Sequence, residues 1–360
     1  MINRSYVFRA DGNAHIGSGH LMRSLTIAEA LADTQENSKN IMFLCADKKS
    51  AELVEKRGFP VRVLHTDYRH MESELFGWRQ MFSPGDADNG GCAGRVILVD
   101  SYYMTEDYLR ELTSFGRILV LDDLQQKAFP ADAVVNYNAF ADPERYQALY
   151  RSSHTKLYLG SDYVPLRPQF SRREPFKERI RDMRSQSEKV RRVLITTGGG
   201  DSCNYALAIL ERIYRENVWY HITAGRFSPH LEKLKQLEKQ RPGVTIHHDV
   251  ADMASLMREC DLAVTAGGTT VYELCALGMC FICFSYAENQ EALTEYVGKH
   301  GIGADAGAAH RDGERVMERI EEWFDLLCRD VRTREAYAHN ARLLTDGRGA
   351  LRLARILEEI

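Results

Sequence analysis

The 360-residue sequence contains no apolar run that approaches the length of a membrane span, and its first residues turn polar after one short strand-like segment. A helix that crosses a bilayer needs about 20 mostly apolar residues, and a secretion signal needs a continuous apolar core. Neither feature is present in the sequence. We therefore predict a cytoplasmic protein without a membrane span.

An excess of charge of one sign is also missing, because 47 Lys and Arg residues nearly balance 51 Asp and Glu residues and leave a formal net charge of −4. Such a chain has no general attraction for polyanions, so nucleic acid is not a predicted partner. The most basic stretch, residues 172–192, interleaves its basic residues with Glu and Asp. We interpret this stretch as a solvated interdomain segment, with weak contact to acidic lipid as the alternative.

The eight cysteines show no disulfide spacing and lie scattered through apolar sequence, which is typical of buried thiols in a reducing compartment. Cys280 and Cys283 form a CxxC pair, but they lie in the strand-like run MCFICF. Residues three apart on a strand point to opposite faces, so this pair is not expected to chelate a metal. No metal site and no cofactor are predicted.

Two successive series of short β-rich runs alternate with helical segments, and a chain of this length favours two domains over one core. The prediction is an α/β protein of two Rossmann-like domains that face each other across a cleft. We place the first domain at residues 1–168, a linker at 169–192, the second domain at 193–345 and a C-terminal helix at 346–360. Between residues 70 and 95 the alternation breaks, and we expect a helix followed by a loop.

The first candidate motif spans residues 8–31, FRADGNAHIGSGHLMRSLTIAEAL, where a strand leads through a glycine loop into a helix. Gly17 and Gly19 allow the backbone to approach a ligand closely. His20 lies at the predicted helix start, where the positive end of the helix dipole favours the neutral imidazole that a general base requires. A helix-capping histidine in a phosphate loop explains the pattern equally well.

Polar residues near this loop are candidates for binding a sugar. Asp11 can orient His20 or a water molecule, and Arg23, one helical turn beyond His20, can face the same cleft. A surface salt bridge is the more common role for both Arg9 and Arg23. Further acidic and aromatic residues end the later predicted strands of the first domain, where helix caps and turns are the alternative. The candidates for the sugar site are Arg9, Asp11, Gly17, Gly19, Asp100 and Tyr102.

The second domain carries three polar clusters, each directly after a predicted strand. TTGGGD and TAGGTT place glycine amides and threonine hydroxyls at helix starts, which is the geometry that binds a diphosphate. A glutamate one turn into the second helix can accept both hydrogens of a ribose diol, and an ENQ cluster follows the next strand. Tight turns and core helices are the alternative. The candidates for binding UDP are Gly198, Gly199, Gly200, Gly267, Gly268, Thr269, Thr270, Glu273, Glu288, Asn289 and Gln290.

Taken in order, the motifs FRADGNAHIGSGHLMRSL, VDSYYMTEDYLREL, VLDDL, LGSDYVPLRPQF, TTGGGD, TAGGTTVYELCALG and SYAENQ resemble the UDP-2,4-diacetamido-2,4,6-trideoxy-β-L-altropyranose hydrolases of pseudaminic acid biosynthesis. The resemblance spans nearly the whole chain. It implies the GT-B architecture of nucleotide-sugar glycosyltransferases, with UDP held by the second domain and the final helix crossing back to the first. It also implies that His20 is the catalytic histidine and that Tyr102 is the tyrosine of the family's DxY-type strand end.

The resemblance implies hydrolysis of the UDP-amino sugar by water, with cleavage between the anomeric carbon and the glycosidic oxygen, inversion, and release of UDP. Substrate and water are then the expected partners. A glycosyltransferase that uses a UDP-amino sugar for envelope polysaccharide is the alternative, and a non-catalytic nucleotide-sugar sensor is a third. The segment from about 70 to 95 is longer than the family pattern requires and is expected to form a lip over the sugar site.

Overall fold

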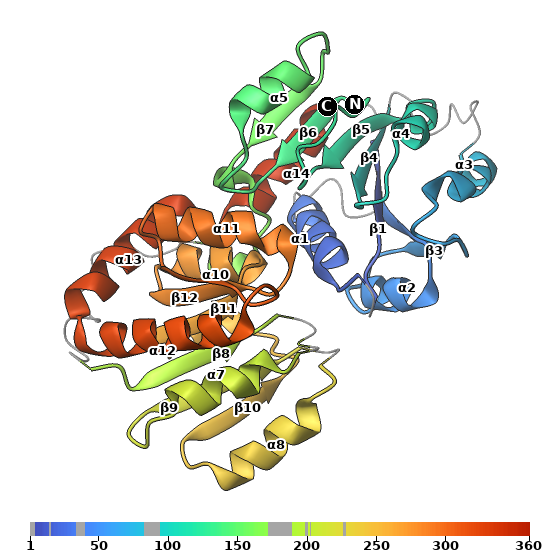
Figure 1. Ribbon diagram of the computed structural model, residues 1–360. Coiled ribbons are helices and arrows are strands. Elements are labelled where there is room, and N and C mark those ends of the chain that lie inside the picture. Colours follow the sequence, from blue (N-terminus) through green and yellow to red (C-terminus); the bar gives the residue numbers. More distant parts are fainter. Residues whose placement is uncertain are drawn as a thin grey trace. The chain divides into compact units, whose positions relative to one another are not determined.

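The computed structural model describes residues 4–13, 16–33, 40–82, 94–171, 189–198, 201, 203–225 and 228–360. The chain divides into two compact units (Figure 1). The first domain comprises Met1–Pro165 together with Arg348–Ile360, and the second domain comprises Leu166–Gly347. The first domain is therefore built from two segments, one before and one after the second domain.

The first domain is built on a parallel sheet of seven strands in the order β3-β2-β1-β4-β5-β6-β7. The order reverses direction between β1 and β4, which makes this the point where open α/β sheets bind their ligands. Both faces of the sheet are covered, so its inner strands consist mostly of buried apolar residues. The strands are β1 Ser5–Ala10, β2 Ile41–Cys45, β3 Val61–Val63, β4 Arg95–Asp100, β5 Arg117–Leu121, β6 Ala133–Asn136 and β7 Lys156–Leu159.

The helices α2, α4 and α5 of the first domain begin where the sequence supplies a side-chain cap. Asp47, Thr105 and Asp142 each accept a hydrogen bond from a backbone N–H in the first turn of the helix that follows. The helices are α1 Gly19–Ala32, α2 Lys48–Glu55, α3 Leu75–Met81, α4 Glu106–Leu112, α5 Pro143–Leu149 and α14 Gly349–Glu359, with 3₁₀ turns η1 Met71–Glu74 and η4 Ser161–Tyr163. The helix expected between 70 and 95 is thus η1 plus α3, and residues 83–93 of the expected loop lie outside the described residues.

The final helix α14 packs against α1 in the first domain (Figure 1). Its apolar side buries Leu353 and Leu357 in the same core cluster as Leu21 and Leu25 of α1. At its start the backbone approaches η4 so closely that a Cβ on Gly349 would lie 2.1 Å from the carbonyl oxygen of Val164. The predicted return of the C-terminal helix to the first domain is confirmed.

The second domain also contains a parallel sheet, with the strand order β10-β9-β8-β11-β12-β13. The strand order reverses direction between β8 and β11. Its strands are β8 Arg192–Thr196, β9 Trp219–Ala224, β10 Val244–His248, β11 Leu262–Ala266, β12 Phe281–Ser285 and β13 Ala304–Ala308. Its helices are α7 Tyr205–Ile213, α8 Leu231–Gln240, α9 Met253–Arg258, α10 Thr269–Leu277, α11 Glu288–Lys299, α12 Gly313–Arg329 and α13 Val331–Leu344, with the 3₁₀ turn η5 Pro168–Phe170.

The sequence also led to expectations about membrane spans, metal sites and the interdomain linker. Among the described helices, none is long and apolar enough to cross a membrane. Cys280 and Cys283 are both buried, and the described residues contain no group of three His, Cys, Asp or Glu side chains arranged to hold a metal. Of the predicted linker 169–192, residues 172–188 lie outside the described part of the chain.

Candidate functional site

The reversal point of the first sheet brings together His20 and Asp100. Ala10 at the end of β1 is the register partner of Asp100 at the end of β4. The loop after β1 leads into α1, whose second residue is His20. As a result, Nδ1 of His20 lies 2.6 Å from Oδ1 of Asp100, and both side chains are largely buried.

Arg23 completes this cluster from the next turn of α1. Its Nε donates to Oδ2 of Asp100 at 2.5 Å, and its Nη2 donates to Oδ1 of the same carboxylate. Its Nη1 lies 2.8 Å from Oδ2 of Asp123 and donates to the Tyr137 hydroxyl. Arg23 is only 8% exposed, so it is a buried ion-pair partner and the surface salt bridge considered from the sequence is wrong.

These contacts determine which nitrogen of His20 can react. Arg23 has only donors, and Nη2 lies 3.0 Å from Nδ1 of His20, yet Nδ1 also lies 2.6 Å from a carboxylate oxygen. A contact that short between nitrogen and carboxylate requires a proton on Nδ1, which then points to Asp100. The neutral imidazole therefore carries its free lone pair on Nε2, which is the arrangement of a general base held by a carboxylate.

Asp100 remains ionised within this cluster. Burial raises the pKa of its carboxyl group, but the charge of Arg23, the interaction with the His20 ring and the hydrogen bonds from both residues outweigh burial and hold the pKa at about 2. For Arg23, burial lowers the pKa of the guanidinium, and the carboxylates of Asp100 and Asp123 more than reverse this effect. A permanently charged Asp100 orients the imidazole and stabilises the imidazolium without taking the proton itself.

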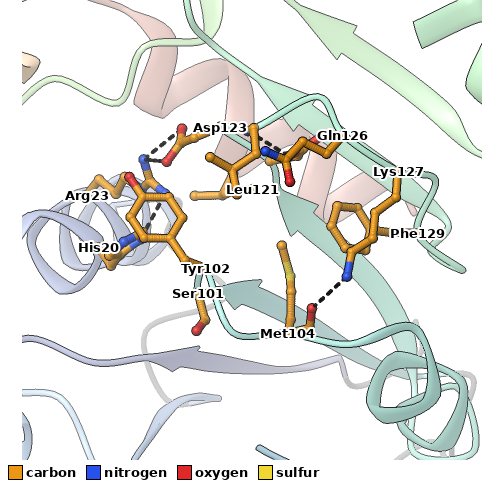
Figure 2. Close-up of a pocket in the computed structure, with 12 residues that line it drawn as sticks. His20, Arg23, Ser101, Tyr102, Met104, Leu121, Asp123, Gln126, Lys127 and Phe129 are labelled. Atoms are coloured by element: carbon orange, nitrogen blue, oxygen red, sulfur yellow. Dashed lines mark hydrogen bonds and ion pairs between the residues drawn. The ribbon is translucent and has the colours of Figure 1, made fainter. Parts of the chain in front are cut away.

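Tyr102 stands over the histidine, as Figure 2 shows. The two rings meet edge to face with centroids 4.4 Å apart, and Tyr102 is 43% exposed. His20 and Tyr102 both line two neighbouring hollows of the first domain, one toward Asp11 and Tyr68 and the other toward Met104 and Lys127. A substrate group can therefore reach the histidine past an exposed aromatic ring.

The glycines of the first motif shape the loop that precedes His20. Gly17 has a φ of +74°, which favours glycine, and it forms an isolated antiparallel bridge with Asn13. Gly19 is the first residue of α1, and a Cβ there would meet nothing within 4 Å. Both positions leave open space at the loop surface beside the histidine.

Arg9 and Asp11 are held in a separate buried network. Arg9 is 0% exposed and binds both carboxylate oxygens of Glu74, with Nε to Oε2 at 2.7 Å, and it also donates to Asp11. Asp11 accepts from the backbone N–H of Ala46 at 2.7 Å, and Tyr108 donates to Glu74. Asp11 therefore does not orient His20, because Asp100 occupies that position, and the fully buried Arg9 ties the η1 turn to β1.

In the second domain, three helices start at the carboxyl ends of β8, β11 and β12. The first turn of α7 is capped by Asp201, which accepts from the N–H groups of Tyr205 and Ala206 at 2.9 Å each. In contrast, α10 and α11 follow Gly268 and Ala287, and neither residue provides a side-chain cap. Free N–H groups at these two helix starts suit an anion.

The predicted UDP residues lie around these helix starts. Gly267 is buried, and a Cβ there would lie 2.6 Å from Cγ2 of Thr294 in α11, so the end of β11 touches α11 directly. Gly268 has open space, and Thr269 and Thr270 open α10. Glu288 and Asn289 are exposed, whereas Oε1 of Gln290 accepts from the N–H of Tyr286 at 3.0 Å. Gly198 has a φ of +87°, and Gly199 and Gly200 lie outside the described residues.

Glu273 has a partner that the sequence motif did not indicate. Its Oε1 accepts from Nη2 of Arg167 at 2.9 Å, and both residues are in the second domain. Burial raises the pKa of the Glu273 carboxyl, while Arg167 acts in the opposite direction. One carboxylate oxygen is thus engaged by the guanidinium, and the other remains available to a ligand.

Several site residues were missed in the sequence, namely Asp123, Lys127, Tyr137 and Arg167. Asp123 lies in the LDDL motif at the end of a predicted strand, and this position could have identified it as a candidate site residue. The others come from loops or late strand ends whose spatial neighbours the local pattern does not reveal.

The chain was compared with known proteins, and no protein-family model matches it. The spore coat polysaccharide biosynthesis protein SpsG of Bacillus subtilis is 23% identical over 98% of this chain and 97% of its own length. The UDP-2,4-diacetamido-2,4,6-trideoxy-beta-L-altropyranose hydrolase of Campylobacter jejuni is 23% identical over 82% of this chain and 96% of its own length. The sequence similarity therefore spans both domains.

Solved structures share the fold at lower identity. MurG of Acinetobacter baumannii superposes with a TM-score of 0.68 at 14% identity, over 99% of this chain and all of the other. Anabaena HepE in complex with UDP-glucose superposes with a TM-score of 0.58 at 14% identity over the same shares. The resemblance to the UDP-2,4-diacetamido-2,4,6-trideoxy-β-L-altropyranose hydrolase that the motifs predicted is confirmed, and the chain has the GT-B fold.

Proposed function

We propose that the chain hydrolyses UDP-2,4-diacetamido-2,4,6-trideoxy-β-L-altropyranose to UDP and the free sugar, with inversion at the anomeric carbon. The observation that carries the proposal is the His20–Asp100 pair at the reversal point of the first sheet, with Nδ1 and Oδ1 2.6 Å apart. Similarity to the Campylobacter hydrolase over 82% of the chain supports the choice of reaction and substrate.

In the proposed step a water oxygen attacks the anomeric carbon while the bond from that carbon to the glycosidic oxygen breaks. The bonding electrons pass to the diphosphate, and the proton of the attacking water passes to Nε2 of His20. Asp100, with its pKa held at about 2, stays ionised and stabilises the imidazolium through Nδ1. Arg23 keeps the Asp100 carboxylate in place by binding both of its oxygens.

General base catalysis contributes about 10²–10⁴-fold, so the rest of the acceleration must come from orientation and from stabilising the leaving group. We assign the diphosphate to the uncapped starts of α10 and α11, where free N–H groups and the helix dipoles favour negative charge. Thr269 and Thr270 add hydroxyl donors there, and Glu273 is assigned to the ribose diol. The N-terminus of α7 is a weaker candidate because Asp201 already caps it.

The deciding experiment incubates the purified protein with the diacetamido UDP-sugar alone, in EDTA, and follows the reaction by NMR in ¹⁸O-labelled water. The proposal requires UDP without the label, a free sugar that carries the label at its anomeric carbon, and the inverted anomer as the first product. Label in UDP would show cleavage at phosphorus instead. Absence of turnover without an added acceptor would contradict hydrolysis.

A glycosyltransferase is the second candidate, because the solved structures that share the fold include MurG and HepE. A transferase would bind the same UDP-sugar but release UDP at an appreciable rate only with an acceptor hydroxyl present. The NMR experiment therefore separates the two candidates. Binding of UDP with no turnover under either condition would leave the sensor hypothesis.

A further inference from the structure

The hollow beside His20 continues into a pocket that the proposed proton transfer does not use. It provides about 430 Å³ of space, part of it open to solvent. Figure 2 shows His20, Arg23 and Tyr102 on one side of this space and Met104, Lys127 and Phe129 on the other. The pocket lies entirely within the first domain. A group attached to the sugar that reaches His20 would therefore meet this second wall.

The far wall is apolar. Met104 follows β4, Leu121 ends β5 and Phe129 lies before β6, and each is less than 10% exposed. The three side chains also belong to the apolar core clusters, so their positions are set by packing against the sheet. A wall of this kind favours a methyl or methylene group over a hydroxyl group, since a hydroxyl placed there would lose its hydrogen bonds to water.

Lys127 places a positive charge at the edge of this wall. Its ammonium group lies 3.5 Å from the carbonyl oxygen of Met104 and 5.4 Å from the ring centroid of Phe129. Asp123 is paired with Arg23, and Asp122 accepts from the Tyr146 hydroxyl and from the N–H of Leu124. Among the described residues no carboxylate pairs with Lys127, so its ammonium can donate to a ligand.

We propose that this pocket binds an acylamino substituent of the sugar, with its methyl group against Met104 and Phe129 and its carbonyl oxygen accepting from Lys127. The inference rests on the proposed function and adds to it the residues that select an acylated sugar. An apolar surface beside an ammonium group that no described carboxylate neutralises matches an acetamido group, which presents a methyl group and a carbonyl group side by side. A sugar hydroxyl offers the ammonium a weaker acceptor and leaves the apolar wall uncovered.

The first test compares kcat/KM for the diacetamido UDP-sugar and for two analogues in which one acetamido group at a time is replaced by hydroxyl. Because a hydrogen bond to a charged group contributes about 1.5–3 kcal/mol, Lys127→Met should lower kcat/KM on the full substrate by about 10- to 100-fold. On one of the two analogues the same variant should have almost no further effect, since the interaction is already lost. Lys156→Met, an exposed lysine of the same domain outside the pocket, serves as the matched control and should behave as wild type.

An equal loss on the full substrate and on both analogues would overturn the assignment of Lys127, because the lysine would then not recognise either acetamido group. A Lys156→Met variant with the same loss would overturn it as well, since the effect would then follow from surface charge in general.

A second test needs no turnover. Saturation-transfer NMR with N-acetylglucosamine as the probe should show transfer to the acetyl methyl protons for the wild-type protein and for Lys156→Met. Transfer should fall to background for Met104→Gln and Lys127→Met, whose folding is checked by hydrogen exchange of the β1 amides in the first domain. Methyl transfer that survives both substitutions overturns the subsite. Methyl transfer that depends on the pocket residues in a protein without hydrolase activity would reject the proposed function while supporting the subsite.

Discussion

Nδ1 of His20 and Oδ1 of Asp100 lie 2.6 Å apart although 80 residues separate them in the sequence. The contact exists because β1 and β4 are neighbours in the sheet and end in register at Ala10 and Asp100. Neither residue is held by its own loop alone, since Arg23 of α1 binds the Asp100 carboxylate with two of its nitrogens. The chemistry proposed for the first domain depends on this one junction between two strand ends.

Replacing His20 by Asn should lower kcat/KM for the diacetamido UDP-sugar by about 10²–10⁴-fold, because the general base is lost. Binding of UDP, measured by calorimetry, should be unchanged. His154→Asn is the matched control, since His154 is an exposed residue of the same domain. Wild-type turnover in the His20→Asn variant would remove the imidazole from the mechanism.

Asp100→Asn should also reduce kcat/KM, by about 10²- to 10⁴-fold, because an amide cannot hold the reactive tautomer of His20. Arg23 donates to both oxygens of Asp100, so the amide nitrogen would face a donor whichever way the side chain turned. The variant should keep its affinity for UDP. Loss of hydrogen-exchange protection at the β1 amides together with activity would instead indicate a purely structural role for Asp100.

Asp100 also makes the free energy of unfolding depend on pH. The pKa of Asp100 falls from 3.8 to about 2 on folding, so its ionised form stabilises the folded protein by ~2 kcal/mol above pH 4. This contribution is lost as the pH falls from about 4 to about 2. Urea unfolding should show a stability difference between the wild type and Asp100→Asn at pH 7 that shrinks toward pH 3. A difference that is constant across this range would mean that the charge of Asp100 does not contribute.

Gly267→Ala should destabilise the second domain by about 1–3 kcal/mol, because the added Cβ would lie 2.6 Å from Cγ2 of Thr294 and 3.1 Å from the carbonyl oxygen of Gln290. Gly268→Ala is the matched control for stability, since a Cβ there meets nothing within 4 Å. Thermal unfolding of the two variants measures the difference. Equal melting temperatures would show that α11 can move away from the end of β11 at little cost.

Leu353→Ala should destabilise the first domain by about 2–5 kcal/mol, because Leu353 of α14 is fully buried in the core that α1 and the sheet share. Leu351→Ala on the same helix is the matched control, since Leu351 is 41% exposed. Hydrogen exchange of the β1 amides reports the stability of the first domain directly. Similar exchange rates in both variants would argue that α14 contributes little to that core.

Local patterns were sufficient to predict the two parallel sheets and the position of His20. Many of the strands are short apolar runs, and many of the loops after them carry glycine or a capping residue, so strand, turn and helix follow there from neighbouring residues. The return of α14 was predicted from the family resemblance, because nothing in residues 346–360 alone indicates which domain the helix joins.

Side-chain partners were harder to predict because they depend on distant segments. Arg9 and Arg23 look alike in the sequence, each polar and close to the glycine loop. Arg9 meets Glu74, which comes from the irregular stretch around η1, and is fully buried, whereas Arg23 meets Asp100 beside the pocket. Asp100 comes within reach of Arg23 because β1 pairs with β4. This pairing depends on the order of all the strands in the sheet, so the local sequence does not distinguish the two arginines.

The first domain is completed by α14, which follows the whole second domain in the chain. A ribosome delivers residues 1–165 early, yet the side chains of α14 that cover α1 emerge only after all of the second domain. Until then the apolar surface of α1 that Leu353 and Leu357 later cover is exposed to water or to a chaperone. The nascent first domain is therefore predicted to be vulnerable to proteolysis until α14 has been synthesised, and a nonsense mutation near codon 348 would remove the helix that covers this surface.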